Sequence, residues 1–89
     1  MPLYRELYRH YHRLFDELAW SCEPGFDWRK ELRARIDSFE ADVDTLDADA
    51  ARTLREELCS QLEHEALHRA RPLAREILFA AVKWLEIAG

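Results

Sequence analysis

Glycine, proline and asparagine are scarce in this sequence, and their scarcity limits the folds it can adopt. The 89 residues include two glycines and three prolines, and asparagine does not occur at all. Tight hairpins and irregular loops depend on such residues, whereas the abundant Ala, Leu, Glu and Arg are strong helix formers. No segment shows the alternating apolar pattern of a β-strand. The composition therefore predicts an all-α protein.

Long apolar runs and cysteines are also few. The longest uncharged apolar run, ILFAAV at 77–82, is far too short to span a bilayer. The first 25 residues carry acidic side chains and lack the apolar core of a signal peptide. We therefore expect a cytoplasmic protein, in which Cys22 and Cys59 are reduced thiols and do not form a disulfide.

Recognisable catalytic motifs are absent as well. The sequence has no glycine-rich phosphate loop and no serine nucleophile motif, and neither cysteine has an evident histidine partner. We therefore expect a protein that is not an enzyme and needs no cofactor. Arginine outnumbers lysine 11 to 2 and alanine occurs 12 times, a bias that GC-rich coding produces, so we expect a bacterial or phage origin.

Length and charge narrow the range of partners. A chain of 89 residues forms one domain, which buries only roughly 60 to 65% of its unfolded surface, so oligomerisation would add useful stability. The 18 acidic and 13 basic residues give a net charge of −5. This balance argues against non-specific DNA binding and allows an acidic surface for a basic partner.

The few helix breakers divide the chain into four helical segments. Pro2 suits a first helical position, CEPGFD at 22–27 is a loop, and Asp27 and Asp47 are suitable N-caps. Pro72 ends or kinks the helix that precedes it. The sequence thus predicts a compact single-domain bundle with helices at about 2–21, 27–46, 48–70 and 72–88, the last two being separate or one helix kinked at Pro72.

Apolar residues recur along each segment at helical spacing. The first two segments carry the stripes Leu3, Leu7, Tyr11, Leu14, Leu18 and Trp28, Leu32, Ile36, Phe39, Val43, Leu46. The third carries Ala51, Leu54, Leu58, Leu62 and Ala66, with Cys59 as a core neighbour. The last has an unusually wide apolar arc, so this helix is either central or shared with another subunit. We expect a homodimer formed through Leu78, Val82 and Leu85.

The stretch DSFEADVDTLDADA, 37–50, contains six acidic residues and no basic one. Asp47 and Asp49 are explained as favourable charges at a helix start. Asp37, Glu40 and Asp44 share one flank of the second segment and form an acidic stripe. A nucleic-acid mimic is one interpretation, but charges spaced by about 5 Å are sparser than the 3.4 Å of a DNA strand. A binding surface for a protein fits the stripe better.

The first two segments carry charges opposed to their helix dipoles. Each begins with basic residues and ends with acidic ones, whereas the dipole favours the reverse. The basic residues are Arg5, Arg9, Arg29, Lys30 and Arg33, and the acidic ones are Asp16, Glu17, Asp42 and Asp44. An antiparallel hairpin of the two segments would bring opposite charges together at both ends.

Two further patterns suggest other kinds of site. Glu65 and His68 have the Glu-x-x-His spacing of di-iron bundles, and His64 lies one turn from His68, so a metal-binding bundle completed by oligomerisation is an alternative. YRELYRHYHR at 4–13 mixes aromatic and basic residues as nucleotide binders do. A helix would, however, turn its tyrosines inward and its arginines outward.

Two large aromatic residues, Trp20 and Phe79, fall on the polar faces of their helices. An exposed aromatic beside arginine is typical of the residues that anchor protein interfaces. The leading interpretation is therefore a small protein-binding module, such as a regulator, an adaptor or a phage-type inhibitor of a host complex. It would act by occlusion through a surface formed by Asp37, Glu40, Asp44, Trp20 and Phe79.

Overall fold

Four helices make up the fold, as the sequence predicts. The computed structural model describes residues 2–21 and 23–88, apart from the side chains of Pro2 and Leu3, so Cys22 lies outside the described residues. The helices are α1 (Pro2–Ser21), α2 (Trp28–Val43), α3 (Ala48–Leu67) and α4 (Pro72–Ala88). None of the helices in these ranges has an apolar stretch long enough to cross a membrane.

Both predicted aspartate caps are confirmed. The Asp27 carboxylate accepts a hydrogen bond from the backbone N–H of Lys30 at 3.4 Å, and that of Asp47 accepts one from Ala50 at 2.9 Å. Each bond satisfies one of the amides that a helix start leaves without an intrahelical partner. These two residues therefore fix where α2 and α3 begin.

Two helices end about three residues before their predicted limits. After α2, Leu46 turns back to hydrogen-bond Val43, and after α3 the N–H of Arg69 bonds to the carbonyl of Ala66. Such bonds span three residues and close a tight turn where the α-helical pattern stops. Pro72 then starts α4 as a separate helix, so the alternative of one long helix kinked at this proline is wrong.

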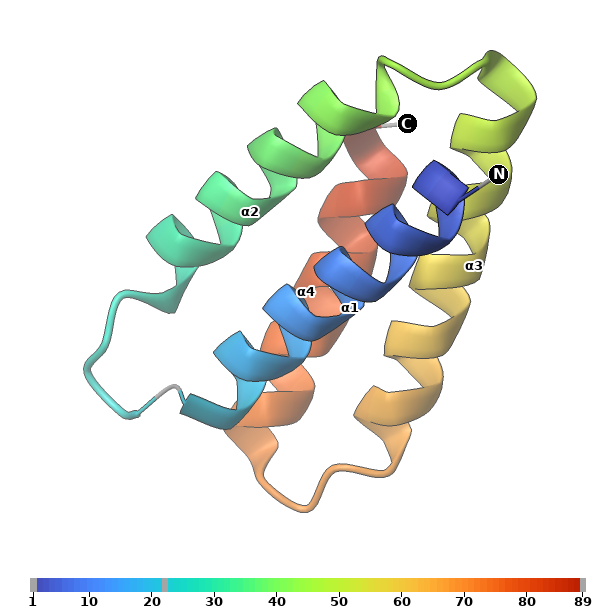
Figure 1. Ribbon diagram of the computed structural model, residues 1–89. Coiled ribbons are helices and arrows are strands. Elements are labelled where there is room, and N and C mark those ends of the chain that lie inside the picture. Colours follow the sequence, from blue (N-terminus) through green and yellow to red (C-terminus); the bar gives the residue numbers. More distant parts are fainter. Residues whose placement is uncertain (1, 22, 89) are drawn as a thin grey trace.

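The helices pack as two antiparallel hairpins, α1 with α2 and α3 with α4 (Figure 1). The bundle measures 38 × 24 × 22 Å, and α4 contacts each of the other three helices. The α1–α2 loop and the α3–α4 loop lie at one end of the bundle, and the α2–α3 connection lies at the other (Figure 1).

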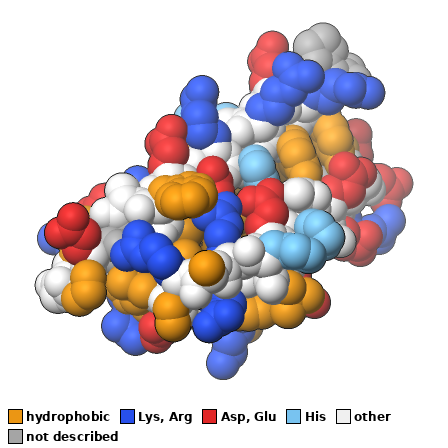
Figure 2. Space-filling model, turned by 90° about the horizontal axis from the view of Figure 1, so that it is seen from below, with side chains coloured by type: hydrophobic (Ala, Val, Ile, Leu, Met, Phe, Trp, Pro, Cys, Tyr) orange, Lys and Arg blue, Asp and Glu red, His pale blue; other side chains and the backbone are white. Residues whose placement is uncertain are grey.

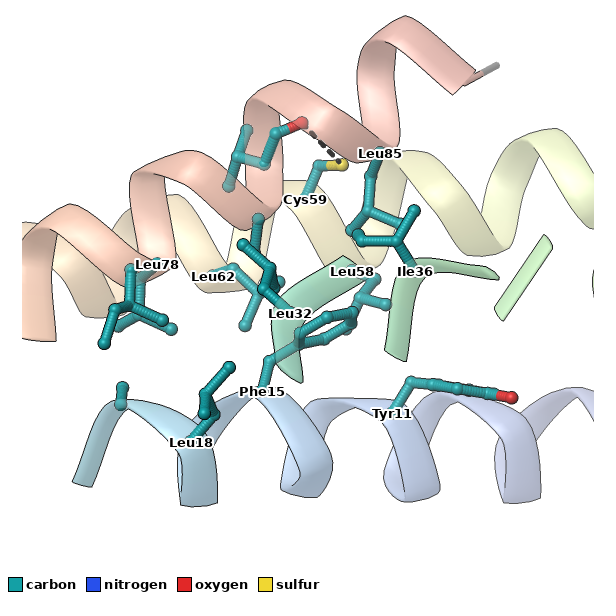
Figure 3. Close-up of a cluster of buried hydrophobic side chains, with 14 of the residues drawn as sticks. Tyr11, Phe15, Leu18, Leu32, Ile36, Leu58, Cys59, Leu62, Leu78 and Leu85 are labelled. Atoms are coloured by element: carbon teal, nitrogen blue, oxygen red, sulfur yellow. Dashed lines mark hydrogen bonds between the residues drawn. The ribbon is translucent and has the colours of Figure 1, made fainter. Parts of the chain in front are cut away.

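One apolar core joins the four helices. Figure 3 shows Phe15 rising from α1 toward Leu58 and Leu62 of α3. Each helix contributes fully buried side chains; the largest are Tyr11, Phe15, Leu32, Phe39, Leu54, Leu58, Leu62, Ile77, Leu78 and Leu85. Most residues of the predicted stripes are buried in this core, whereas Leu7, Leu14, Leu46 and Ala51 pack against it and are half-buried.

The wide apolar arc of α4 is explained by its central position. Leu78, Val82 and Leu85 are all buried within the single chain, where α1, α2 and α3 all contact α4. These side chains are therefore not available at the surface for a second subunit. Of the two interpretations of the arc, the structure supports the central helix, and the basis for a homodimer through these residues is removed.

Candidate functional site

Glu40 is not a free part of the predicted acidic stripe. Its carboxylate pairs with the guanidinium of Arg55 on α3, with 2.7 Å between Glu40 Oε1 and Arg55 Nη2. Arg55 also donates to the backbone carbonyl of Leu85 on α4 at 2.9 Å. Glu40 thus helps to join α2, α3 and α4. The exposed part of the stripe is reduced to Asp37 and Asp44.

Asp42 also has a structural partner. It accepts a hydrogen bond from the hydroxyl of Tyr11, which lies 2.8 Å from the hydroxyl oxygen of Ser38. Burial, and after it the bond to Asp42, raises the pKa of Tyr11 to about 12. Tyr11 is buried and the Tyr4 and Tyr8 side chains are half-buried. The tyrosines of α1 therefore do not form an exposed stacking surface for nucleotides.

The antiparallel arrangement of α1 and α2 is found, but among the described residues no ion pair joins the two helices. Asp16 near the end of α1 pairs with Arg69 of the α3–α4 loop. At the start of α2, Arg29 lies 3.6 Å from Glu76 of α4. The charges that oppose the helix dipoles are thus compensated in part by α3, α4 and their loop.

Within the described part of the single chain, the Glu-x-x-His motif is not completed to a metal site, and a site completed by oligomerisation stays a prediction. Glu65 faces α1, where it contacts His12, and it also accepts hydrogen bonds from Gln61 at 2.8 Å and Arg69 at 3.2 Å. His64 and His68 are exposed, and Nδ1 of His68 donates to the backbone carbonyl of His64 at 2.9 Å. Within residues 2–21 and 23–88, no group of three His, Cys, Asp or Glu residues is placed to hold a metal ion.

The environment of Glu65 makes its contribution to stability depend on pH. Burial acts to raise its pKa, but hydrogen bonds from Gln61 and His12, the charge of His12 and a hydrogen bond from Arg69 together outweigh burial and lower it. A carboxylate with a lowered pKa stabilises the fold above its unfolded pKa of about 4.3, and this contribution is lost as the pH falls through the folded pKa.

We expect Glu65→Gln to lower the free energy of unfolding most above about pH 5. The deficit relative to the wild type should shrink as the pH falls through the folded pKa of Glu65, because the wild-type side chain then becomes neutral like that of the variant. Urea unfolding across this range measures both curves. Exposed Glu63→Gln on the same helix is the control. A deficit that grows on acidification would contradict the prediction.

Trp20 is a large exposed aromatic side chain that is held in place from one side. Its side chain is at the end of α1 and the residue is 63% exposed. The guanidinium carbon of Arg69 lies 5.0 Å from the centre of the indole ring, and Arg71 donates to the Trp20 backbone carbonyl at 3.2 Å. Arg69 is itself fixed by Asp16 and Glu65. The indole is thus positioned by an ion-pair network and still faces solvent.

Other exposed apolar side chains come from elements that meet at this end. Phe26 lies in the α1–α2 loop and Leu67 is the last residue of α3, and both are exposed. In Figure 2, which views the bundle from this end, orange apolar side chains lie between blue Lys and Arg side chains. We call the surface formed by Trp20 and the two arginines that contact it, Arg69 and Arg71, the Trp20 end.

The five residues predicted for protein binding do not share one surface. Trp20 lies in the last turn of α1, and Asp44 comes directly after α2. These two helices end at opposite ends of the bundle (Figure 1). Phe79 lies within α4 and is exposed, as predicted. Phe26 and Leu67 were not predicted, although both fall outside the apolar stripes. The roles of Arg69 and Arg71 depend on a loop whose position the sequence does not reveal.

Cys59 is a core residue and a poor candidate nucleophile. It is buried, and its thiol points to the carbonyl oxygen of Val82 with 3.9 Å between the two atoms (Figure 3). Burial, followed by the nearby Glu86 carboxylate, raises the pKa of the thiol to about 11. The reactive thiolate is therefore scarce at neutral pH.

Comparison of the chain with protein-family models, curated proteins and solved structures finds no match in any of the three. Its function therefore has to be argued from its own residues, and the Trp20 end is the surface that they favour.

Proposed function

We propose that this chain is a protein-binding module that contacts its partner through the Trp20 end and acts by covering part of the partner's surface. The exposed indole of Trp20 carries the proposal. Tryptophan and arginine are both enriched among the residues that dominate interface energies. A non-catalytic regulator, adaptor or inhibitor would use such a surface.

The fixed position of Trp20 supports the proposal further. Binding costs free energy when a flexible side chain has to be ordered, by about 0.5–1.5 kcal/mol for each side chain. Arg69 packs on one face of the indole and is held by Asp16 and Glu65. Part of that ordering is therefore complete before a partner arrives. The complementary site would be an apolar pocket that receives the indole.

The proposal predicts that a partner is captured through Trp20. Immobilised wild-type chain should enrich a specific protein from an extract of the source organism. Trp20→Ala should reduce that enrichment at least tenfold, which corresponds to about 1.4 kcal/mol of binding free energy. Quantitative mass spectrometry of the bound fraction provides the measurement. Circular dichroism should show an unchanged helix content, because the indole lies outside the core.

Ile87 provides the matched control. It is 72% exposed, comparable with Trp20, but it lies near the end of α4, away from the α1–α2 loop. Ile87→Ala should retain the captured protein. Once the partner is identified, its addition should shift the fluorescence of Trp20 to shorter wavelength, because the indole would leave water. Capture that is unaffected by Trp20→Ala would refute the proposal.

A further inference from the structure

A groove of about 890 Å³ lies between α3 and α4. Its apolar lining includes the small side chains of Ala51 and Cys59 on α3 and of Val82 on α4. Leu67, which is exposed, lies at one end of it. Small residues along two packed helices leave room for the ridge of a third helix. The shape of the groove therefore suits an elongated helical ligand.

The groove is acidic. Glu56, Glu63 and Glu86 all line it and are exposed, and they have no ion-pair partner among the residues that the structure describes. The two arginines of the groove already have partners, since Arg55 pairs with Glu40 and Arg52 with Asp49. The uncompensated charge along the groove is therefore negative.

The negative field extends to the floor of the groove. Besides burial, Glu86 and Glu63 help to raise the pKa of the Cys59 thiol, although Arg55 acts in the opposite direction. A second copy of the chain would bring the same three carboxylates toward this surface. Like charges brought together cost free energy, so the groove disfavours its own copy and favours a cationic ligand.

We propose that the groove between α3 and α4 binds a cationic amphipathic helix of a partner protein. Glu56 and Glu63 are seven residues apart on α3, a rise of about 10 Å, so Lys or Arg residues seven apart on the ligand would match them. The apolar face of the ligand would lie on Ala48, Ala51 and Leu67, which are exposed or half-buried, whereas Cys59 and Val82 form the buried floor. This is helix-in-groove recognition, and it is independent of the Trp20 end.

Two synthetic peptides test the proposal. Each has about 18 residues, enough for a helix of about 27 Å, with leucine along one face. One carries lysine on its polar face and the other carries glutamate. Fluorescence anisotropy at about 0.15 M salt should show binding of the lysine peptide and no binding of the glutamate peptide. Absence of binding by the lysine peptide would overturn the proposal.

Paired variants locate the site. Glu56→Lys with Glu63→Lys should weaken binding of the lysine peptide at least tenfold. Asp37→Lys with Asp44→Lys makes the same change in net charge on α2 and its C-cap, and it should alter the affinity by less than about twofold. Equal weakening by both pairs would show attraction by net charge alone and would overturn the proposal.

A neutral variant tests whether the groove itself is needed for binding, without changing the charge of the protein. Ser60→Trp places an indole in the groove at an exposed position of α3 without changing the charge, and it should also block the lysine peptide. Retained affinity in this variant would overturn the proposal. Trp20→Ala should leave peptide binding intact, so the two proposed surfaces can fail separately.

Discussion

Phe15→Ala is expected to lower the free energy of unfolding by about 3–5 kcal/mol. Phe15 is fully buried, and its ring points from α1 toward Leu58 and Leu62 (Figure 3). Its removal loses the free energy gained by transferring the ring out of water, and it leaves a cavity that the packed helices fill only in part. A domain of this size has a total stability of only about 4–13 kcal/mol, so the variant should lie close to unfolding.

Chemical denaturation followed by circular dichroism measures this loss. The matched control is Phe79→Ala, which removes the same side chain from an exposed site on α4 and should cost about 1 kcal/mol or less. The comparison separates burial from helix propensity, because both positions lie inside helices. Similar losses for the two variants would contradict the assignment of Phe15 to the centre of the core.

Arg55→Met is expected to lower the free energy of unfolding by about 2 kcal/mol, between the values for exposed and for fully buried ion pairs. The Arg55 side chain is 17% exposed and that of Glu40 is 28% exposed. Loss of the guanidinium leaves the Glu40 carboxylate half-buried without its partner and also removes the bond to the carbonyl of Leu85.

A double-mutant cycle tests the pair directly. Glu40→Met combined with Arg55→Met should cost less than the sum of the single changes, by about 1 kcal/mol, because no carboxylate is then left unpaired. Arg52→Met is the control on the same helix. Its pair with Asp49 has side chains that are 68% and 86% exposed, so the loss should be about 0.5 kcal/mol or less. Additive single changes at Arg55 and Glu40 would show that the pair has no net coupling.

The sequence predicted the helices and the core better than it predicted the surface. Helical periodicity reports which face of a helix is buried, and this information is local to each segment. The same is true of the caps at Asp27 and Asp47, where one side chain serves an amide three residues away. The ends of the helices were predicted less accurately. Both α2 and α3 stop in a tight turn, and the hydrogen bonds that close these turns have no distinctive sequence signal.

The proposed binding surface could be predicted only in part, because its residues come from separate elements. The exposure of Trp20 and Phe79 followed from their positions outside the apolar stripes. The prediction that Glu40 belongs to an exposed acidic stripe was wrong, because Glu40 pairs with Arg55. These residues are fifteen positions apart, and sequence spacing does not reveal the contact. The Glu-x-x-His spacing likewise does not reveal that Glu65 contacts His12 of α1.

By itself, the sequence determined that this protein is helical, where its helix breakers lie and which side chains are buried. These properties follow from backbone propensity and from the 3.6-residue period of the helix. Only the tertiary structure decided that α4 is central, which charges neutralise one another and which remain exposed. An ion pair or a groove depends on the distance between helices, and packing of the whole chain sets that distance.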